Sequence, residues 1–221
     1  MNMGVDGVFP HLHCTATDRR TGNEALELLT GWAMLEAALW TLGREQVWIG
    51  LSTIVVMAAF NLASGCTAWE QGFSLRANRR AWWMVPVAVV LAAAIVAGGA
   101  VAGTLHGLYG YRAPLWHAAG YMAWAFVQEW MALGFVFVRL ERLVPRYAVL
   151  GCAAVFCAAH LPNPVLMAAT FLMSAVFAMV FQRYRALYPL AFAHALFGLA
   201  VAVAMPRWMT HFMRVGMAYF K

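Results

Sequence analysis

Residues 81–103 read AWWMVPVAVVLAAAIVAGGAVAG and contain no charged side chain. A helix of about 20 apolar residues spans the hydrocarbon core of a bilayer, so this stretch is long enough to cross a membrane once. The whole chain has the same character, because 64% of its 221 residues are hydrophobic and 11% are charged, against roughly 25% charged in an average soluble domain. A soluble protein needs more polar residues to cover its surface, which indicates a membrane protein.

Apolar runs recur along the rest of the sequence, and none shows the alternating period of a barrel strand. The pattern predicts an all-α membrane protein, a polytopic bundle of about seven transmembrane helices. The predicted spans are 24–42, 46–64, 81–103, 115–138, 147–161, 163–182 and 186–205. This divides the chain into a polar N-terminal tail (1–23), a transmembrane domain (24–205) and a C-terminal segment (206–221) whose aromatic and basic residues suit the membrane interface.

The basic residues predict the orientation of the bundle. With a cytoplasmic N-terminus, ten of the 15 Lys and Arg residues lie on the inner side, Arg139 among them in a loop. We therefore expect an integral protein of the bacterial inner membrane, surrounded by the lipid bilayer. The basic residues stand singly or in small groups between apolar runs, which does not indicate nucleic-acid binding. Residues 1–23 lack the apolar region of a cleavable signal peptide.

A few polar residues lie inside the predicted spans, where a charged side chain costs roughly 2.5–3.5 kcal/mol on insertion scales. Glu129, His160 and His194 come from three different spans. At about 1.5 Å per residue they lie roughly 15, 21 and 13 Å from the nearest inner ends, and we assign them to one layer. A carboxylate and two imidazoles around a shielded water suit general acid–base chemistry. Glu36 with Glu27 in the first span is better explained by helix capping, by snorkelling to the interface or by pairing with an arginine than by catalysis.

The spacing around these residues resembles a known family. Phe156 and His160 fit an FxxxH motif, Gln128-Glu129 stands where a paired Glu-Glu is expected, and His194 begins an HxxxN-like position. This order is similar to that of the CPBP family, the intramembrane proteins related to CAAX prenyl endopeptidases, which are glutamic-type intramembrane proteases. The resemblance covers about residues 115–205.

The resemblance implies a catalytic role for three residues. Glu129 and His160 would activate a water for attack on a carbonyl, and His194 would stabilise the oxyanion. We expect Gln128, Phe156, Asn163 and Trp124 to contact the substrate, a hydrophobic peptide or a prenylated or isoprenoid molecule. Tyr121, Trp124 and Trp130 flank the site on the fourth predicted span and are candidates for lining a substrate groove, although packing alone would also explain them.

Three positions depart from the family pattern. Gln128 replaces the first glutamate, Leu133 the motif arginine and Gly198 the motif asparagine. An amide cannot act as a general base. We expect Glu129 to take over the role of the base, or the base to be lost. Asn163 is a candidate for the missing hydrogen-bond donor.

Three functions therefore remain open on the sequence. The first is an intramembrane hydrolase of the CAAX-protease type, and the second is acid–base chemistry on an isoprenoid or lipid without cleavage. The third is a degenerate family member that binds a partner or substrate without turnover. Two histidines and a carboxylate can also hold a metal, with His106 and His117 as further ligands. No compact ligand spacing is present, so we predict no metal and no cofactor.

Overall fold

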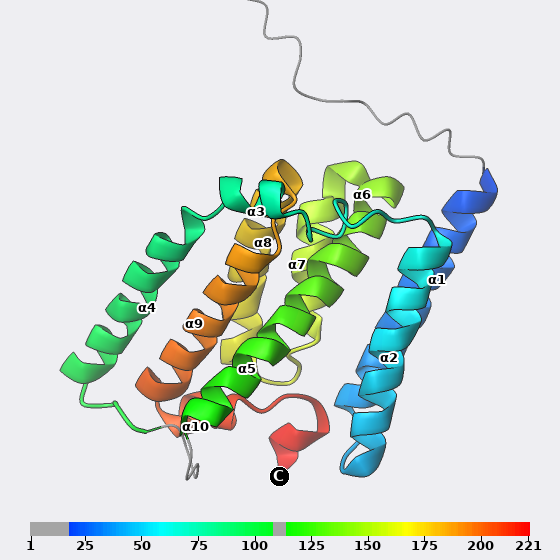
Figure 1. Ribbon diagram of the computed structural model, residues 1–221. Coiled ribbons are helices and arrows are strands. Elements are labelled where there is room, and N and C mark those ends of the chain that lie inside the picture. Colours follow the sequence, from blue (N-terminus) through cyan, green and yellow to red (C-terminus); the bar gives the residue numbers. More distant parts are fainter. Residues whose placement is uncertain (1–17, 108–113) are drawn as a thin grey trace, which may run out of the picture.

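The computed structural model describes residues 18–107 and 114–221, and within these ranges it contains helices and no strand. The long helices run alternately up and down through a single bundle (Figure 1). The α-helices are α1 Asp18–Leu39, α2 Arg44–Ala63, α3 Leu75–Arg80, α4 Met84–Val101, α5 Pro114–Glu129, α6 Val138–Leu143, α7 Ala148–Ala158, α8 Pro164–Tyr184, α9 Tyr188–Ala204 and α10 Arg207–Thr210. A π-helix, Trp130–Phe137, joins α5 to α6, and short 3₁₀ turns cover Pro145–Tyr147, His211–Met213 and Gly216–Phe220.

This architecture confirms the predicted fold class of a polytopic helical membrane protein. By length and composition, four helical segments of the described residues can cross a membrane: Arg44–Ala63, Met84–Val101, Trp116–Leu143 and Pro164–Tyr184. The predicted fifth and seventh spans are the shorter apolar helices Pro145–Ala158 and Tyr188–Ala204. The predicted first span is α1, which begins six residues earlier, at Asp18. Residues 1–17 of the predicted tail lie outside the described residues.

Small residues bring α4 against α9 at one edge of the bundle (Figure 1). A Cβ atom on Gly99 would come within 2.9 Å of the backbone of Ala204, so the two helices touch there almost backbone to backbone. Ala88 and Ala92 are buried at one-turn spacing on α4, and Thr104 Oγ1 donates to the Ala204 carbonyl at 2.6 Å. Such small-residue contacts are the usual means of helix association where lipid removes the hydrophobic driving force. At the opposite edge α1 packs against α2.

The π-helix begins directly after Glu129, and polar side chains bond to its backbone. Asn61 Nδ2 donates to the Gly134 carbonyl at 3.2 Å, and Arg139 Nη1 donates to the Phe135 carbonyl at 3.3 Å. A π-helix replaces the i→i−4 pattern of an α-helix and is common at functional sites. The apolar periodicity of this span predicted a regular helix and did not reveal the π-helix.

The sequence predicted that Arg139 lies in a cytoplasmic loop, and this prediction is wrong, because Arg139 is buried in the bundle. Only 1% of its side chain is exposed. Its Nη2 lies 2.7 Å from Glu27 Oε2, its Nη1 donates to Asn61 Oδ1 at 2.7 Å, and its guanidinium stacks 3.7 Å from the centroid of the Phe135 ring. The helix continues through this position into α6, which carries Arg139 inside the bundle. The pairing confirms that Glu27 contacts an arginine.

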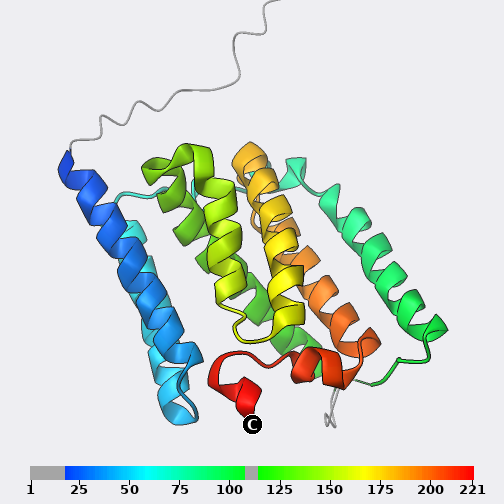
Figure 2. The same cartoon turned by 180° about the vertical axis from the view of Figure 1, so that it is seen from behind.

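The C-terminal segment (206–221) crosses beneath the turn between α7 and α8 (Figure 2, in red). Asn163 Nδ2 donates to the carbonyls of Thr210 (2.7 Å) and Arg214 (3.1 Å). Gly216 N donates to the Leu161 carbonyl at 2.6 Å. The segment is therefore hydrogen-bonded to the turn that carries His160. Its location at a membrane interface stays a prediction.

Candidate active site

Glu129 and His194 form a buried pair between two helices that pack against each other. Glu129 is the last residue of α5 and His194 lies in the middle of α9, and their side chains are 2% and 6% exposed. His194 Nδ1 lies 2.8 Å from Glu129 Oε1. Since a carboxylate oxygen accepts, we assign the proton of this hydrogen bond to Nδ1. Glu129 therefore orients the His194 ring through this hydrogen bond.

His160 lies in the turn after α7, and its ring orientation is set by the residue one helical turn before it. His160 Nδ1 lies 2.8 Å from the Phe156 carbonyl oxygen. A carbonyl can only accept, so Nδ1 carries a proton. In the neutral ring this leaves the lone pair on Nε2, which makes Nε2 the basic atom of this histidine.

The Phe156 ring contacts both imidazoles. Its centroid lies 5.1 Å from that of His160 and 5.7 Å from that of His194, with the two pairs edge to face. The FxxxH spacing thus places an aromatic ring against both histidines. Glu129, by contrast, hydrogen-bonds to His194 and not to His160, which differs from the pairing that the family resemblance implied.

A cavity of about 310 Å³ opens beside His160 between α1, α2, α5, the π-helix and α7. The polar side chains Gln46, Gln128 and His160 face it, together with Phe156 and Trp124. Glu129 and His194 are not among its lining residues. The rest of the lining is apolar: Trp32, Leu35, Leu39, Met57, Met131, Ala132, Val136, Cys152, Val155, Ala159 and Val215. Position 128, where the family has its first glutamate, thus faces the cavity with His160.

A second cavity of about 430 Å³ lies between α5, α9 and the C-terminal segment. Trp124 lines both cavities and therefore stands between them. Tyr121 and Gly198 line the second cavity, and the Tyr121 ring lies edge-on to His194 with centroids 6.4 Å apart. The second cavity is thus lined by residues from both α5 and α9.

Four polar groups around these cavities have no hydrogen-bond partner among the described residues. They are the Gln128 amide, Nε2 of His160, Nε2 of His194 and the hydroxyl of Tyr121. None of the four is fully enclosed by protein. Buried polar groups are normally hydrogen-bonded, and those that are not call for an explanation. These four are available to a water or a substrate.

Asn163 has a different role from the one considered on the sequence. Its Oδ1 accepts from the Leu166 amide at 3.2 Å and so caps α8, while Nδ2 donates to two carbonyls of the C-terminal segment. An amide nitrogen has two hydrogens, and both are used. Asn163 therefore has no free donor for an oxyanion.

Some residues of the site could not be found from the sequence pattern. Tyr121 was considered only as a residue that flanks the site and lines a substrate groove, without a role for its hydroxyl, and Gln46 was not singled out at all. The signal for Tyr121 was Gly198, because a missing side chain at a motif position leaves space for another one. Among the described residues, no group of three or more His, Cys, Asp or Glu side chains is placed to hold a metal. His106 Nε2 lies 2.8 Å from the Met205 carbonyl oxygen.

The fold is that of a polytopic helical membrane protein, and its bundle contains a buried carboxylate–imidazole pair next to a second histidine ring across Phe156. The family model described as type II CAAX prenyl endopeptidase Rce1-like matches residues 111–200. This match agrees with the resemblance of this region to the CPBP family, and at the family level the region is similar to CAAX protease-type membrane hydrolases. Comparisons with curated proteins and with solved structures gave no match.

Proposed function

We propose that this protein is an intramembrane hydrolase that cleaves a peptide or lipid-linked substrate with water activated beside His160. The observation that carries the proposal is a set of four polar groups without a partner among the described residues. His160 Nε2 and the Gln128 amide lie at the first cavity and the Tyr121 hydroxyl at the second, and Nε2 of His194 lies next to Phe156 and Tyr121. The match to the family model supports a prenylated peptide as the substrate class. The apolar lining of the first cavity suits a hydrophobic substrate.

In the proposed reaction, His160 Nε2 accepts a proton from a water that the Gln128 carbonyl oxygen helps to orient. The hydroxide oxygen bonds to the scissile carbonyl carbon, and negative charge develops on the carbonyl oxygen. His194 donates from Nε2 to this oxygen, with the Glu129 carboxylate stabilising the imidazolium from the other side of the ring. The carbon–nitrogen bond then breaks, and His160 returns its proton to the leaving amine. Glu129 thus acts through His194.

The test is an assay of purified protein in detergent with a fluorescent peptide that carries a prenylated cysteine three residues before its C-terminus. Cleavage releases the C-terminal fragment, which mass spectrometry identifies. His160→Ala removes the base and should lower the rate by about 10²–10⁴-fold. Cys157→Ala, at the end of the same helix, does not alter the cavity lining and should keep the wild-type rate. Full activity in His160→Ala, or no cleavage by the wild type, would contradict the proposal.

A second function is acid–base chemistry on an isoprenoid or lipid without cleavage. Gln128 favours it, because the cavity position of the expected carboxylate base carries an amide. Incubation with a prenyl alcohol or prenylated peptide should then yield a product of changed structure and no released fragment. Binding without any product would indicate a degenerate member of the family. Gln128→Glu separates these cases, since a base restored beside His160 should increase cleavage by a hydrolase and leave a non-hydrolytic reaction without fragments.

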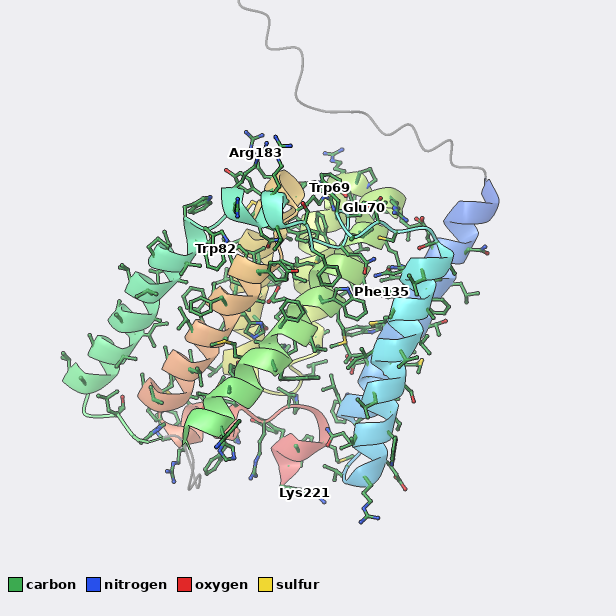
Figure 3. The ribbon with its side chains drawn as sticks, viewed as in Figure 1. Trp69, Glu70, Trp82, Phe135, Arg183 and Lys221 are labelled. Carbon is green, nitrogen blue, oxygen red and sulfur yellow. The ribbon has the colours of Figure 1, made fainter. Side chains whose placement is uncertain are left out.

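We also propose that the N-terminus is cytoplasmic. Arg183 and Lys221 lie at opposite ends of the bundle (Figure 3). The Arg183 end also carries Arg76, Arg79, Arg80, Arg142, Arg146 and Arg185, which follows the excess of positive charge expected on the cytoplasmic side. Labelling single cysteines in intact cells with a membrane-impermeant maleimide tests this. Reaction at position 79 and protection at position 207 would contradict it.

A further inference from the structure

The Tyr121 side chain packs directly against the Cα atom of Gly198, where a side chain at position 198 would begin. A Cβ atom built on Gly198 would lie 1.9 Å from the Tyr121 hydroxyl oxygen and 2.5 Å from Cζ of the same ring. The tyrosine hydroxyl therefore occupies the space into which a side chain at position 198 would extend. Any larger residue at 198 requires the tyrosine to move.

Position 198 lies one helical turn after His194, on the same face of α9. In the HxxxN pattern that the sequence resembles, this position carries an asparagine, whose amide donates a hydrogen bond. In this protein the hydroxyl of Tyr121, from α5, occupies the space of that asparagine side chain. A phenol hydroxyl is also a donor, so the hydrogen-bonding capacity is retained although the motif residue is lost.

The surroundings of Tyr121 leave its hydroxyl free to bind a ligand. It makes no hydrogen bond to a described residue, it is not fully enclosed, and its ring lines the second cavity beside Trp124. The ring edge meets His194, whose Nδ1 is held by Glu129. The Tyr121 hydroxyl and the His194 ring are thus neighbours between α5 and α9.

We propose that Tyr121 is a catalytic residue whose hydroxyl donates a hydrogen bond to the oxyanion, in place of the side chain that Gly198 lacks. This inference rests on the proposed hydrolase function, because an oxyanion forms only if a carbonyl is attacked. His194 and Tyr121 then form the oxyanion hole, and His160 with Gln128 forms the water side.

The test is Tyr121→Phe in the prenylated-peptide assay. Phenylalanine keeps the ring that packs against Gly198 and His194 and removes only the donor. Loss of one oxyanion donor costs about 10²–10³-fold in kcat, with KM nearly unchanged. Tyr188→Phe is the matched control, because Tyr188 also donates its hydroxyl, to the Phe73 carbonyl at 3.3 Å, but lines neither cavity. It should keep the wild-type kcat.

A rescue experiment separates donation from packing. Tyr121→Ala opens the space, and the double variant Tyr121→Ala/Gly198→Asn supplies an amide donor from α9. The double variant should recover at least about tenfold in kcat over Tyr121→Ala, whereas Tyr121→Ala/Gly198→Leu fills the space without a donor and should not.

Each outcome bears on one of the two proposals. Wild-type kcat in Tyr121→Phe, with His160→Ala inactive, would overturn the role of Tyr121 and leave the hydrolase proposal intact. Full activity in His160→Ala, or no cleavage by the wild type, would overturn the hydrolase proposal and the inference with it.

Discussion

Two acid–base pairs among the described residues, Glu27–Arg139 and Glu129–His194, have at least one fully buried partner, and their surroundings differ. Arg139 uses Nε and Nη2 on Glu27 and Nη1 on Asn61, and its flat face stacks on Phe135. The Glu129–His194 pair has a single hydrogen bond of 2.8 Å, and Nε2 of the histidine bonds to no described residue. The first pair is saturated by protein partners and the second is not.

The number of hydrogen-bond partners indicates whether a pair inside the bilayer stabilises the fold or is available to a ligand. A buried charge is costly unless it is paired and hydrogen-bonded, so a saturated cluster indicates that the charge serves to hold helices together. The Arg139 cluster joins α1, α2 and α6, and Asn61 extends it to Gln71, which also accepts from the Trp130 indole. The incomplete pair on α5 and α9 keeps a polar atom for a ligand. Removing each pair should therefore affect different properties.

The largest expected effect is on stability, from Arg139→Met. This change leaves the Glu27 carboxylate, 15% exposed, and the Asn61 amide without their main partner. Breaking a buried pair in this way costs about 3–5 kcal/mol. The unfolding free energy, measured by SDS titration in mixed micelles, should fall by that amount, and cleavage should be lost because the fold is lost.

Two variants control for this result. Arg142→Met removes ion pairs to Glu24 and Glu70, but its side chain is 29% exposed, so the loss should stay below about 1 kcal/mol. The double change Glu27→Leu/Arg139→Met removes both charges and should be more stable than Arg139→Met alone. Equal losses for Arg139→Met and Arg142→Met would show that the Arg139 cluster is no more important than a surface ion pair.

The next effect is on catalysis, from Glu129→Gln. The amide fills the same volume and can accept from His194 Nδ1, but it no longer stabilises a charged imidazolium. We expect kcat for the prenylated peptide to fall by about 10²-fold, near 2.7 kcal/mol in activation free energy, with the unfolding free energy changed by less than about 1 kcal/mol. Glu129→Asp retains the charge and should keep more activity. If Glu129→Gln instead unfolds the protein as Arg139→Met does, the two pairs have the same structural role.

Features of the fold that depend on local sequence could be predicted, and those that depend on contacts between distant residues could not. Apolar run length and proline positions depend on local sequence, and the seven predicted spans correspond to α1, α2, α4, α5 to α6, α7, α8 and α9. The π-helix after Glu129 could not be predicted, because it is accompanied by hydrogen bonds from Asn61 and Arg139. Arg139 was misplaced because its partner Glu27 is 112 residues away in the sequence.

Three polar residues of the candidate site could be singled out from the sequence, but their pairing could not be predicted. Glu129, His160 and His194 stand out because each is costly inside a span. Which histidine Glu129 contacts depends on how α5 packs against α9, and no sequence spacing reveals that. The position of the Tyr121 hydroxyl could not be predicted, since it depends on the packing of Tyr121 against Gly198, on another helix.

The smallest expected effect on stability comes from Glu70→Gln, in the loop before α3 at the exposed end of the bundle. Glu70 Oε2 accepts from the backbone amide (2.7 Å) and hydroxyl (2.9 Å) of Thr67, and Oε1 accepts from Arg142 at 2.8 Å. Burial raises the pKa of this carboxyl, but the hydrogen bonds from Thr67 and Arg142 outweigh it and leave the pKa below its ordinary value. Ionised Glu70 therefore contributes to stability.

The sign of the pH dependence follows from the lowered pKa. A carboxyl whose pKa is lower in the folded state stabilises the fold above its unfolded pKa, about 4.3 for glutamate, and loses that contribution as the pH falls through the folded value. The stability difference between wild type and Glu70→Gln should thus be present at pH 7 and shrink below about pH 4. Since Glu70 is 21% exposed in its ion pair, 1 M salt should reduce the part due to Arg142 and leave the part due to Thr67. A difference that stays constant down to pH 3 would mean that the carboxylate charge contributes nothing at this end of the bundle, in contrast to Glu27 and Glu129 inside it.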